Sequence, residues 1–582
     1  MEERRRLRHP QYPVRIFALH KITSARELED RLQRHSRDYS WNSRIPELDP
    51  WQAEVINTGT DRNAPFTKRI AAIFNHPAIR RLKSEPQLGW MRENYPSATH
   101  TRWAHTLGTF DSLVLMYSAL LADPEVPTFR VLINVDDIEH AMLAAILHDI
   151  GQTAFGHDFE SLSTFDSHET YVHGLLQEDI WGDTLEQTIK QHWPQIDTGR
   201  VLQILHISRV KDQDAEKEPR PVDGIAADAI NGPIDADKLD YLLRDSIACG
   251  VPYGLGMDRT RLVRALTVSA RVLSGGKCRM NIAYRAKGRA AVESMVFARY
   301  QMYVAVYWHH AFRAVVSMFG YALVETFGKK KVKDRYRNIQ FTQKDLQKLF
   351  YLRIVCRQEW SKIFPRLFRT PEVPTLLTEP APAIVAAEPA IEFVWRFAED
   401  HVRNLLVRLT SRSLYKRIFD FSLGELGERA DYSKMQQEFT GTKRVSHANE
   451  IQKLLLSAID SQIKLHGEKT ITTSESAARS RLQELSGLEC PLVVIDFPTR
   501  GLPEETNLPT EISDPHRKYF GIPAPRKNGS FSVFHDVRRL QMRKAPVRVF
   551  AAPELQELVL RYLDAEAVDK CVGGSIPMLL QE

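Results

Sequence analysis

Histidine, aspartate and arginine residues in the first half of the chain have the spacing of ligands for a metal ion. His148 and Asp149 are adjacent and follow an apolar segment, Ala141–Leu147. An imidazole nitrogen and a carboxylate oxygen from such a pair can bind the same divalent cation. Upstream, Arg102 and His105 are three residues apart and would share one face of a helix. These residue types indicate chemistry assisted by a divalent cation.

A third segment, residues 234–245 (IDADKLDYLLRD), has the pattern of an acidic helix that buries hydrophobic residues on one face. Taken singly, these segments carry little weight. An isolated His–Asp pair occurs by chance, and a lone histidine on an apolar face is more often a hydrogen-bonded core residue than a ligand. The interpretation therefore depends on the segments occurring together and in a fixed order.

That order resembles the HD superfamily. The matching motifs are RxxH at 102–105, HDxG at 148–151, GHxxE at 156–160, HE at 168–169 and DxDKxDYxxRD at 235–245. The chain resembles more closely the deoxynucleoside triphosphate triphosphohydrolases, which include the SAM-and-HD-domain enzyme and bacterial dGTPases. The resemblance extends from about His76 to Val324 and returns weakly at Lys544–Tyr562.

The resemblance implies a metal site formed by His105, His148, Asp149 and Asp237. Mixed nitrogen and oxygen ligation suits Mn, Fe, Mg or Zn, and the sequence does not choose among them. A divalent ion at such a site neutralises the α-phosphate of a nucleotide and holds a water for attack on phosphorus. The implied reaction is hydrolysis of a deoxynucleoside triphosphate to the deoxynucleoside and inorganic triphosphate.

The resemblance also implies catalytic residues. His157 with Glu160 matches the family's catalytic His–acid pair, and His168 with Glu169 matches a further active-site pair. Imidazoles at these positions can transfer a proton to the leaving 5′-oxygen. The chain departs from the family at Gln152, where histidine is usual. Glutamine can form hydrogen bonds, but it cannot become charged or transfer a proton. We expect Gln152 at the rim of the metal site, bonded to a catalytic neighbour or a substrate oxygen, in a working enzyme.

A nucleotide pocket is implied in the same way. The matching positions are Gln87 and Leu88 for the sugar and base, Arg102, Lys238 and Arg299 for the triphosphate, Tyr241 and Asp245 for the deoxyribose, and Tyr307 beside the base. An aromatic ring closing the sugar pocket would exclude the ribose 2′-hydroxyl and favour deoxynucleotides. The segment at 299–310 can also be interpreted as an ordinary aromatic core helix, apart from Arg299 and Tyr307.

The fold that must position these residues is expected to be mainly α, with a helical HD-domain core and a smaller C-terminal α+β lobe. Apolar residues recur with helical spacing in Leu107–Ala122, Ile138–Ile150 and Val292–Val324. Near the C-terminus, Pro491–Phe497, Ser530–Phe534 and Val547–Ala551 have the composition of strands, and Pro553–Ala565 that of a helix.

These patterns divide the chain into four parts. We expect an N-terminal extension (1–64), an HD-domain phosphohydrolase core (65–325), a helical region with a proline-rich excursion at 371–389 (326–470) and the C-terminal α+β lobe (471–582). The composition is 43% hydrophobic and 26% charged, with no run of 18 apolar residues and five dispersed cysteines. This composition favours a cytoplasmic globular protein without a membrane partner.

Three alternatives remain open at this point. The chain could hydrolyse another nucleotide, as a nucleotidase or a phosphodiesterase. It could be a nucleotide-sensing scaffold with weak or no catalysis, since Gln152 replaces a family histidine. It could bind nucleic acid through basic clusters at residues 4–8 and 329–337, although solvated surface is the simpler interpretation of both.

The resemblance further implies a homo-oligomer (dimer, tetramer or hexamer) and an activating nucleotide, for which no residues can be assigned.

Overall fold

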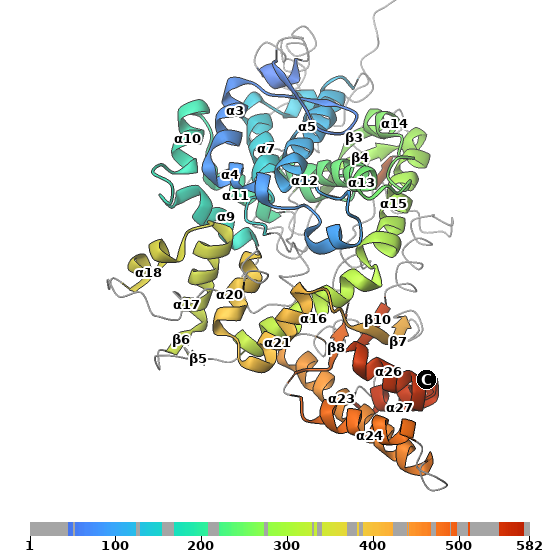
Figure 1. Cartoon of the computed structure of the whole chain (residues 1–582). Coiled ribbons are helices and arrows are strands. Elements are labelled where there is room, and N and C mark those ends of the chain that lie inside the picture. Colours follow the sequence, from blue (N-terminus) through green and yellow to red (C-terminus); the bar gives the residue numbers. More distant parts are fainter. Residues whose placement is uncertain are drawn as a thin grey trace, which may run out of the picture.

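The computed structural model of the chain is mainly helical, as predicted (Figure 1), and its described residues form four small sheets. The structure describes residues 45–49, 53–123, 128–153, 168–207, 220, 222–272, 278–328, 331–333, 340–368, 381–382, 388–422, 439, 441–466, 473–488, 490–497, 510–512 and 546–575. Among the described helices, none combines the length and the apolar character needed to cross a membrane.

The part of the core that precedes residue 265 is built around a long helix, α5 (Arg102–Leu121), which packs against α7 (Val135–Leu147) and α13 (Ala236–Cys249). A short hairpin of β1 (Val55–Asn57) and β2 (Asn63–Pro65) packs against α5. The surrounding elements are α3 (Lys68–Asn75), α4 (Pro77–Arg80), η3 (Arg81–Ser84), η4 (Gly89–Glu93), α6 (Thr128–Leu132), α9 (His168–Gln177), α10 (Leu185–His192), α11 (Thr198–Ile207), α12 (Asp223–Asn231) and α14 (Arg259–Arg264).

The three central helices begin where the sequence provides capping side chains. Thr101 accepts a hydrogen bond from a backbone amide in the first turn of α5, and Asn134 forms a capping box at α7. Asp235 caps α13, and that helix ends at Gly250, whose φ of 67° is left-handed and favours glycine. These caps fix the ends of the helices that carry the predicted metal ligands.

The segment predicted to be helical over Val292–Val324 contains a break. It forms α15 (Arg289–Met302), a π-helical turn η8 (Tyr303–Tyr307) and α16 (His310–Phe327). The amide of Trp308 donates to the carbonyl of Tyr303 at 2.8 Å, the bond spacing of a π-helix. Apolar spacing alone does not reveal such a turn, because both helical types bury similar faces. A three-stranded sheet of β3 (Leu266–Val272), β4 (Cys278–Arg285) and β9 (Thr510–Ile512) packs against α12 through β4.

A second group of helices follows residue 340 and lies beside α9 and α16 (Figure 1). It comprises α17 (Gln343–Phe350), the π-helical turn η9 (Tyr351–Val355), α18 (Trp360–Phe368), α20 (Pro389–Phe397) and α21 (Asp400–Thr410), with a small hairpin of β5 (Lys331–Lys333) and β6 (Gln340–Thr342).

The C-terminal lobe packs along α16 (Figure 1) and is an α+β unit, as predicted. Its sheet has the order β7-β10-β8, with β10 (Pro546–Ala551) antiparallel to both neighbours. Strands β8 (Val493–Asp496) and β10 match two predicted strands, whereas β7 (Lys416–Ser422) comes from the region expected to be helical. The helices of the lobe are α23 (Gly441–His466), α24 (Thr473–Ser486), α26 (Pro553–Tyr562) and α27 (Ala565–Ser575). The strand predicted at Ser530–Phe534 lies outside the described residues.

Candidate metal centre and nucleotide site

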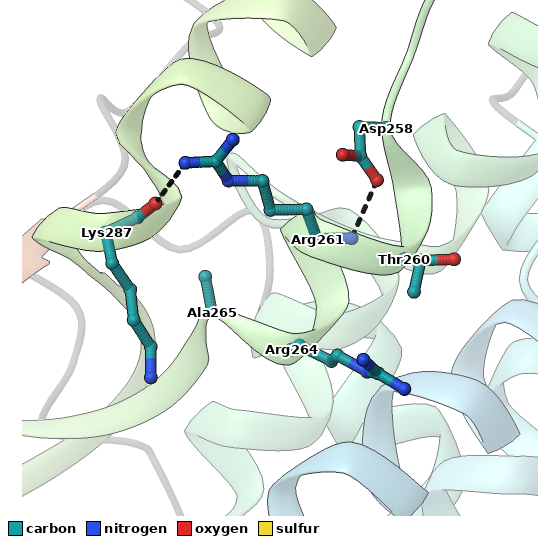
Figure 2. A pocket seen from close by; sticks show the side chains of 6 residues that line it. All are labelled: Asp258, Thr260, Arg261, Arg264, Ala265 and Lys287. Atoms are coloured by element: carbon teal, nitrogen blue, oxygen red, sulfur yellow. Dashed lines mark hydrogen bonds between the residues drawn. The ribbon is translucent and has the colours of Figure 1, made fainter.

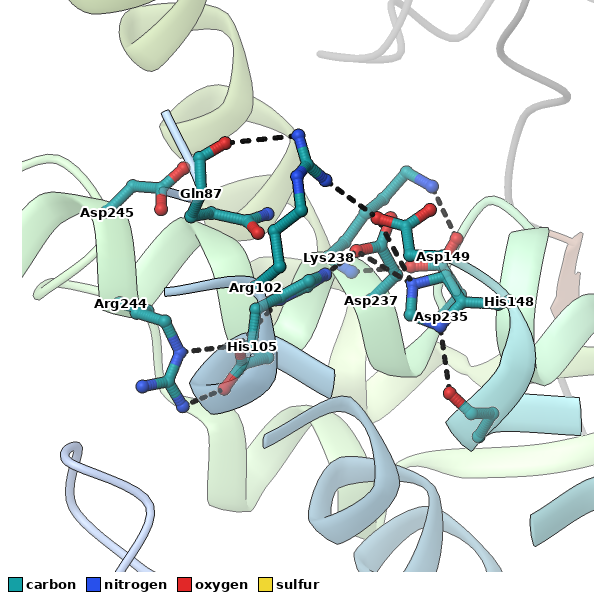
Figure 3. A network of polar contacts seen from close by, with 12 residues as sticks. Gln87, Arg102, His105, His148, Asp149, Asp235, Asp237, Lys238, Arg244 and Asp245 are labelled. Atoms are coloured by element: carbon teal, nitrogen blue, oxygen red, sulfur yellow. Dashed lines mark hydrogen bonds and ion pairs between the residues drawn. The ribbon is translucent and has the colours of Figure 1, made fainter. Parts of the chain in front are cut away.

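Three of the four predicted metal ligands lie together. Ligand atoms of His105, His148 and Asp237 are all within 4.8 Å of one another, and the side chains come from α5, the end of α7 and the start of α13 (Figure 3). His105 Nε2 is 3.0 Å from Asp237 Oδ1, and His148 Nε2 is 4.0 Å from the same oxygen. Two imidazoles and a carboxylate in this arrangement fit a divalent transition metal or Mg²⁺.

The environment of His148 supports metal ligation. Its Nδ1 is 2.8 Å from the carbonyl oxygen of Ala145, so that nitrogen carries the proton and donates. Its Nε2 is therefore an acceptor, and this atom is buried without a hydrogen-bond partner. A buried acceptor without a partner is unfavourable, and a cation between His148 and Asp237 would satisfy it. The residues present therefore fit a bound metal ion.

His105 is held from behind by a carboxylate. Asp240, one turn along α13 from Asp237, lies 2.8 Å from His105 Nδ1 and accepts two hydrogen bonds from Arg244, each 2.8 Å long. Burial disfavours the charged imidazole, but Asp237 and Asp240 outweigh it and raise the pKa of His105 to about 10. The pKa of the Asp240 carboxyl is lowered: its burial acts in the other direction, but His105 and Arg244 dominate. Without a cation, this pair of carboxylates therefore favours a proton on His105 Nε2.

The fourth predicted ligand, Asp149, lies beside the cluster. Its Oδ2 is 3.8 Å from His148 Nε2 and 3.4 Å from a guanidinium nitrogen of Arg102 (Figure 3). Its Oδ1 is 3.7 Å from His168 Nε2. Arg102 also donates to the backbone carbonyls of Thr153 and Gln87, at 3.0 and 3.4 Å. Asp149 is thus placed between the metal ligands and a buried arginine.

Gln152 is buried, with 1% of its surface exposed. Its side-chain nitrogen lies 2.9 Å from Nδ1 of His168, the first residue of α9. Gly151 allows this approach: a Cβ at that position would lie 2.0 Å from the backbone carbonyl oxygen of His168. The glycine of the HDxG motif therefore brings the start of α9 against the turn that carries His148 and Asp149.

Predicted nucleotide residues form a second cluster beside the metal ligands. The hydroxyl of Tyr307 donates to Asp245 Oδ2 at 2.7 Å, and His100 Nε2 is 2.8 Å from Asp245 Oδ1. The rings of Tyr241 and Tyr307 contact edge to face, with centroids 6.3 Å apart. Burial, followed by the charge of Asp245, raises the pKa of Tyr307, so this phenol is a neutral donor. The guanidinium of Arg299 lies over the ring of Tyr303, at 4.9 Å.

Three further residues predicted to bind the nucleotide are Lys238, Gln87 and Leu88. The ammonium of Lys238 is bound by Asp235 at 2.5 Å and by the carbonyl of Gly232 at 3.0 Å, so it is oriented by its own helix end. The backbone carbonyl of Gln87 accepts a hydrogen bond from Arg102 (Figure 3), and the side-chain oxygen of Gln87 is buried without a hydrogen-bond partner. Leu88 packs against the core.

The predicted catalytic residues are described only in part. His157 and Glu160 lie outside the described residues, and the side chain of Glu169 is likewise not among those described. Sequence reasoning missed Asp240 and Arg244 as partners of the metal site. Their signal was their position in the DxDKxDYxxRD motif, in which residues 237, 240 and 244 fall on one face of a helix.

Two family models match separate parts of the chain. The HD domain matches residues 102–223, and the HD associated region matches residues 257–366. The chain therefore carries an HD domain followed by an HD-associated region. His105, His148 and Asp149 lie within the HD match, and Asp237 lies between the two matched segments.

Several curated proteins are similar over part of their length. An uncharacterized protein of Methanocaldococcus jannaschii is 28% identical over 48% of this chain and 51% of its own length. Protein YwfO of Bacillus subtilis is 28% identical over 42% of this chain and 49% of its own. The deoxynucleoside triphosphate triphosphohydrolase SAMHD1 homolog of Dictyostelium discoideum is 24% identical over 49% of this chain and 51% of its own. The chain thus spans about half the length of these relatives.

Proposed function

We propose that this chain is a metal-dependent phosphohydrolase that converts deoxynucleoside triphosphates to deoxynucleosides and inorganic triphosphate. The observation that carries the proposal is the convergence of His105, His148 and Asp237, with the buried Nε2 of His148 lacking a hydrogen-bond partner. A divalent cation held there, with Asp149 as a further ligand, would supply a Lewis acid for the α-phosphate and an activated water. The HD-domain match supports this chemistry, and the named deoxynucleotide triphosphohydrolases among the relatives support the substrate class.

The chain's own residues would bind and orient the nucleotide. Lys238 and Arg299 are the cations proposed to hold the triphosphate, because fixed positive charge stabilises phosphate oxygens strongly. Arg102 would contribute to the same end of the site while it orients Asp149. His157, with Glu160, is proposed to deliver the proton to the leaving 5′-oxygen.

The sugar is proposed to lie against Tyr241 and the Tyr307–Asp245 pair. Asp245 already accepts hydrogen bonds from the Tyr307 hydroxyl and faces His100, so one carboxylate organises both sides of this pocket. An aromatic wall of Tyr241 and Tyr307 leaves little polar capacity for an additional 2′-hydroxyl. A site without a partner for that hydroxyl discriminates against ribonucleotides by leaving a polar group unpaired.

One assay tests the proposal. The purified chain is incubated with each dNTP and each NTP in Mn²⁺ or Mg²⁺, and the products are separated by chromatography. We expect deoxynucleoside and intact triphosphate from the dNTPs and little turnover of the NTPs. Release of orthophosphate or pyrophosphate as the first product would favour another nucleotide hydrolase. Binding of dNTPs without turnover in any metal would favour a nucleotide-sensing scaffold.

A basic pocket is a candidate second site, for an activating nucleotide. The pocket has a volume of about 510 Å³ and is lined by Asp258, Thr260, Arg261, Arg264, Ala265 and Lys287 (Figure 2). Three of these six side chains are cationic, which suits the phosphates of a nucleotide. We propose that an activator binds there, in a homo-oligomer. Arg264→Ala and Lys287→Ala should then reduce stimulation by an added nucleotide while leaving basal hydrolysis unchanged, and equal stimulation in both variants would contradict this assignment.

A further inference from the structure

The turn that carries His148 and Asp149 is held by a buried arginine outside the predicted site. Helix α7 ends at Leu147, and the carbonyl groups at a helix C-terminus lack intrahelical partners. Arg81, on η3, donates to the carbonyl of Ile150 and, at 3.4 Å, to the carbonyl of Gln152. One guanidinium therefore fixes the backbone on the C-terminal side of both predicted ligands.

Arg81 is itself compensated by a buried carboxylate. The side chain of Arg81 is 5% exposed and that of Glu85 is 1% exposed, with Arg81 Nη1 3.9 Å from Glu85 Oε1. A buried cation requires a nearby negative charge. The backbone carbonyl of Glu85 also accepts the amide hydrogen of Arg102 at 2.8 Å, at the start of α5. Glu85 thus contacts the start of the helix that carries His105 directly, and the turn that carries His148 through Arg81.

Glu85 is held in turn from the helices that follow residue 340. Arg357 donates to Glu85 Oε1 from Nε at 2.8 Å and also from Nη2. The carboxylate therefore lies between two guanidinium groups that are 276 residues apart in the sequence. It connects the turn at the metal ligands with η9, whose last residue is Val355.

The backbone at Arg357 is in an unfavourable conformation. Its φ is +55°, in the left-handed region that favours glycine, and Arg357 and Arg412 are the non-glycine residues with positive φ in the described part of the chain. Strained backbone of this kind persists where the surrounding structure requires it, often at functional sites. An arginine at this position supplies the guanidinium that Glu85 needs.

The same segment also touches the other side of the site. Tyr351, the first residue of η9, stacks on Tyr171 of α9 with ring centroids 5.3 Å apart and an interplanar angle of 23°. Helix α9 begins at His168, which pairs with Gln152. Residues 351–357 therefore contact both the support of the metal-ligand turn and the helix that faces it.

We propose that Arg357, Glu85 and Arg81 are positioning residues that act in series, so that the segment of residues 351–357 sets the geometry of the turn carrying His148 and Asp149. The inference rests on the proposed metal centre at that turn. Partners that orient metal ligands from behind typically contribute about tenfold to hundredfold to metal affinity. Loss of the Arg357–Glu85 contact should therefore weaken metal binding in a chain that remains folded.

The test measures Mn²⁺ binding to the full chain from the electron paramagnetic resonance signal of free Mn²⁺, together with the thermal midpoint of each variant. In Arg357→Gly the guanidinium is lost while the backbone conformation becomes easy, so weaker binding cannot come from added strain. We expect its Mn²⁺ dissociation constant, and that of Glu85→Gln, to rise by about tenfold or more. The Mn²⁺ dissociation constant of the double variant should equal that of the single variant with the lower affinity, because both changes break the same series of contacts. Arg357→Lys should recover part of the affinity.

Arg412→Gly is the matched control. Arg412 is also an arginine at positive φ (60°) and also pairs with a glutamate, Glu93 at 3.5 Å, but both side chains are about half exposed (56% and 49%). Its Mn²⁺ affinity should equal that of the wild type. Unchanged affinity in Arg357→Gly and Glu85→Gln would overturn the inference, as would an equal loss in the control. A wild-type chain that binds no Mn²⁺ would instead overturn the metal centre, and the inference with it.

Discussion

Asp240 is the residue for which the structure makes the sharpest quantitative prediction. It is 3% exposed and accepts from His105 Nδ1 and twice from Arg244, at 2.8 Å each. In Asp240→Asn, the amide retains one oxygen and presents an NH₂ group to donors that need an acceptor. The variant therefore loses the charge that orients His105 and breaks a buried ion pair with Arg244.

The two consequences have different magnitudes. Breaking a buried pair by neutralising one partner typically costs about 3–5 kcal/mol of folding free energy, and the retained oxygen places this variant at the lower end. Arg244 keeps its hydrogen bond to the carbonyl of Thr58, at 2.7 Å, which also limits the loss. Removal of a carboxylate behind a histidine ligand lowers metal affinity by about tenfold to hundredfold. We expect both effects, measured by urea unfolding of the metal-free protein and by Mn²⁺ titration.

Asp111→Asn separates these effects. Asp111 is on the same helix as His105, is 2% exposed and pairs with Arg62 at 2.6 Å. Its replacement should lower the free energy of unfolding but leave Mn²⁺ affinity at the wild-type value. Wild-type Mn²⁺ affinity in Asp240→Asn would refute the role assigned to Asp240, and an equal affinity loss in Asp111→Asn would show that destabilisation alone explains it.

The remaining predictions concern pH, Gln152 and Gly151. Folding of the metal-free protein raises the pKa of His105 from 6.5 to about 10, so the stability of the metal-free protein should fall as the pH rises from 6.5 to about 10. Mn²⁺ affinity should rise over the same range, because the proton on His105 leaves. Thermal midpoints and calorimetric titrations at several pH values measure the two effects, and profiles that do not change with pH would contradict the coupling. Gln152→His should keep or raise dNTP turnover, and Gln152→Ala should lower kcat/KM by about tenfold to hundredfold, the loss of one positioning hydrogen bond; equal rates for Gln152→Ala and wild type would exclude a catalytic role. Gly151→Ala should destabilise the chain by about 1–3 kcal/mol, because the added Cβ would lie 2.0 Å from the carbonyl oxygen of His168. Gly256→Ala is the control and should not destabilise the chain, because a Cβ at that position would have no atom within 4 Å. Similar thermal midpoints for the two variants would refute this prediction.

Local patterns were sufficient to predict much of the helical framework. The apolar spacing after Leu107 predicted α5, and the segment before His148 predicted α7, since a buried helix face repeats every three to four residues. The same rule could not separate α15 from α16, because the π-helical turn at Tyr303–Tyr307 arises from hydrogen-bond register rather than from the apolar pattern. Strand β7 was also missed, since its residues become a strand by pairing with β10, which lies far along the chain.

In the site, too, residues that lie in local motifs could be predicted from the sequence, whereas residues that depend on long-range contacts could not. His105, His148 and Asp237 could be named from motifs, because those motifs lie on helices whose ends the sequence marks. Arg81, Glu85 and Arg357 could not be named, because their contacts join segments separated by up to 276 residues and no local pattern encodes them. Asp240 was within a motif, yet its bond to His105 depends on how α13 packs against α5.

Metal occupancy of the double variant Asp149→Ala, Asp237→Ala is the direct test of the proposed metal centre. The wild-type and variant chains are saturated with Mn²⁺, freed of unbound ion and analysed by elemental mass spectrometry, with circular dichroism to verify that both are folded. We expect about one Mn²⁺ per wild-type chain and almost none in the variant, because two of the four proposed ligands are gone. Undiminished Mn²⁺ in the folded variant would show that the ion binds elsewhere and would contradict the proposed metal centre.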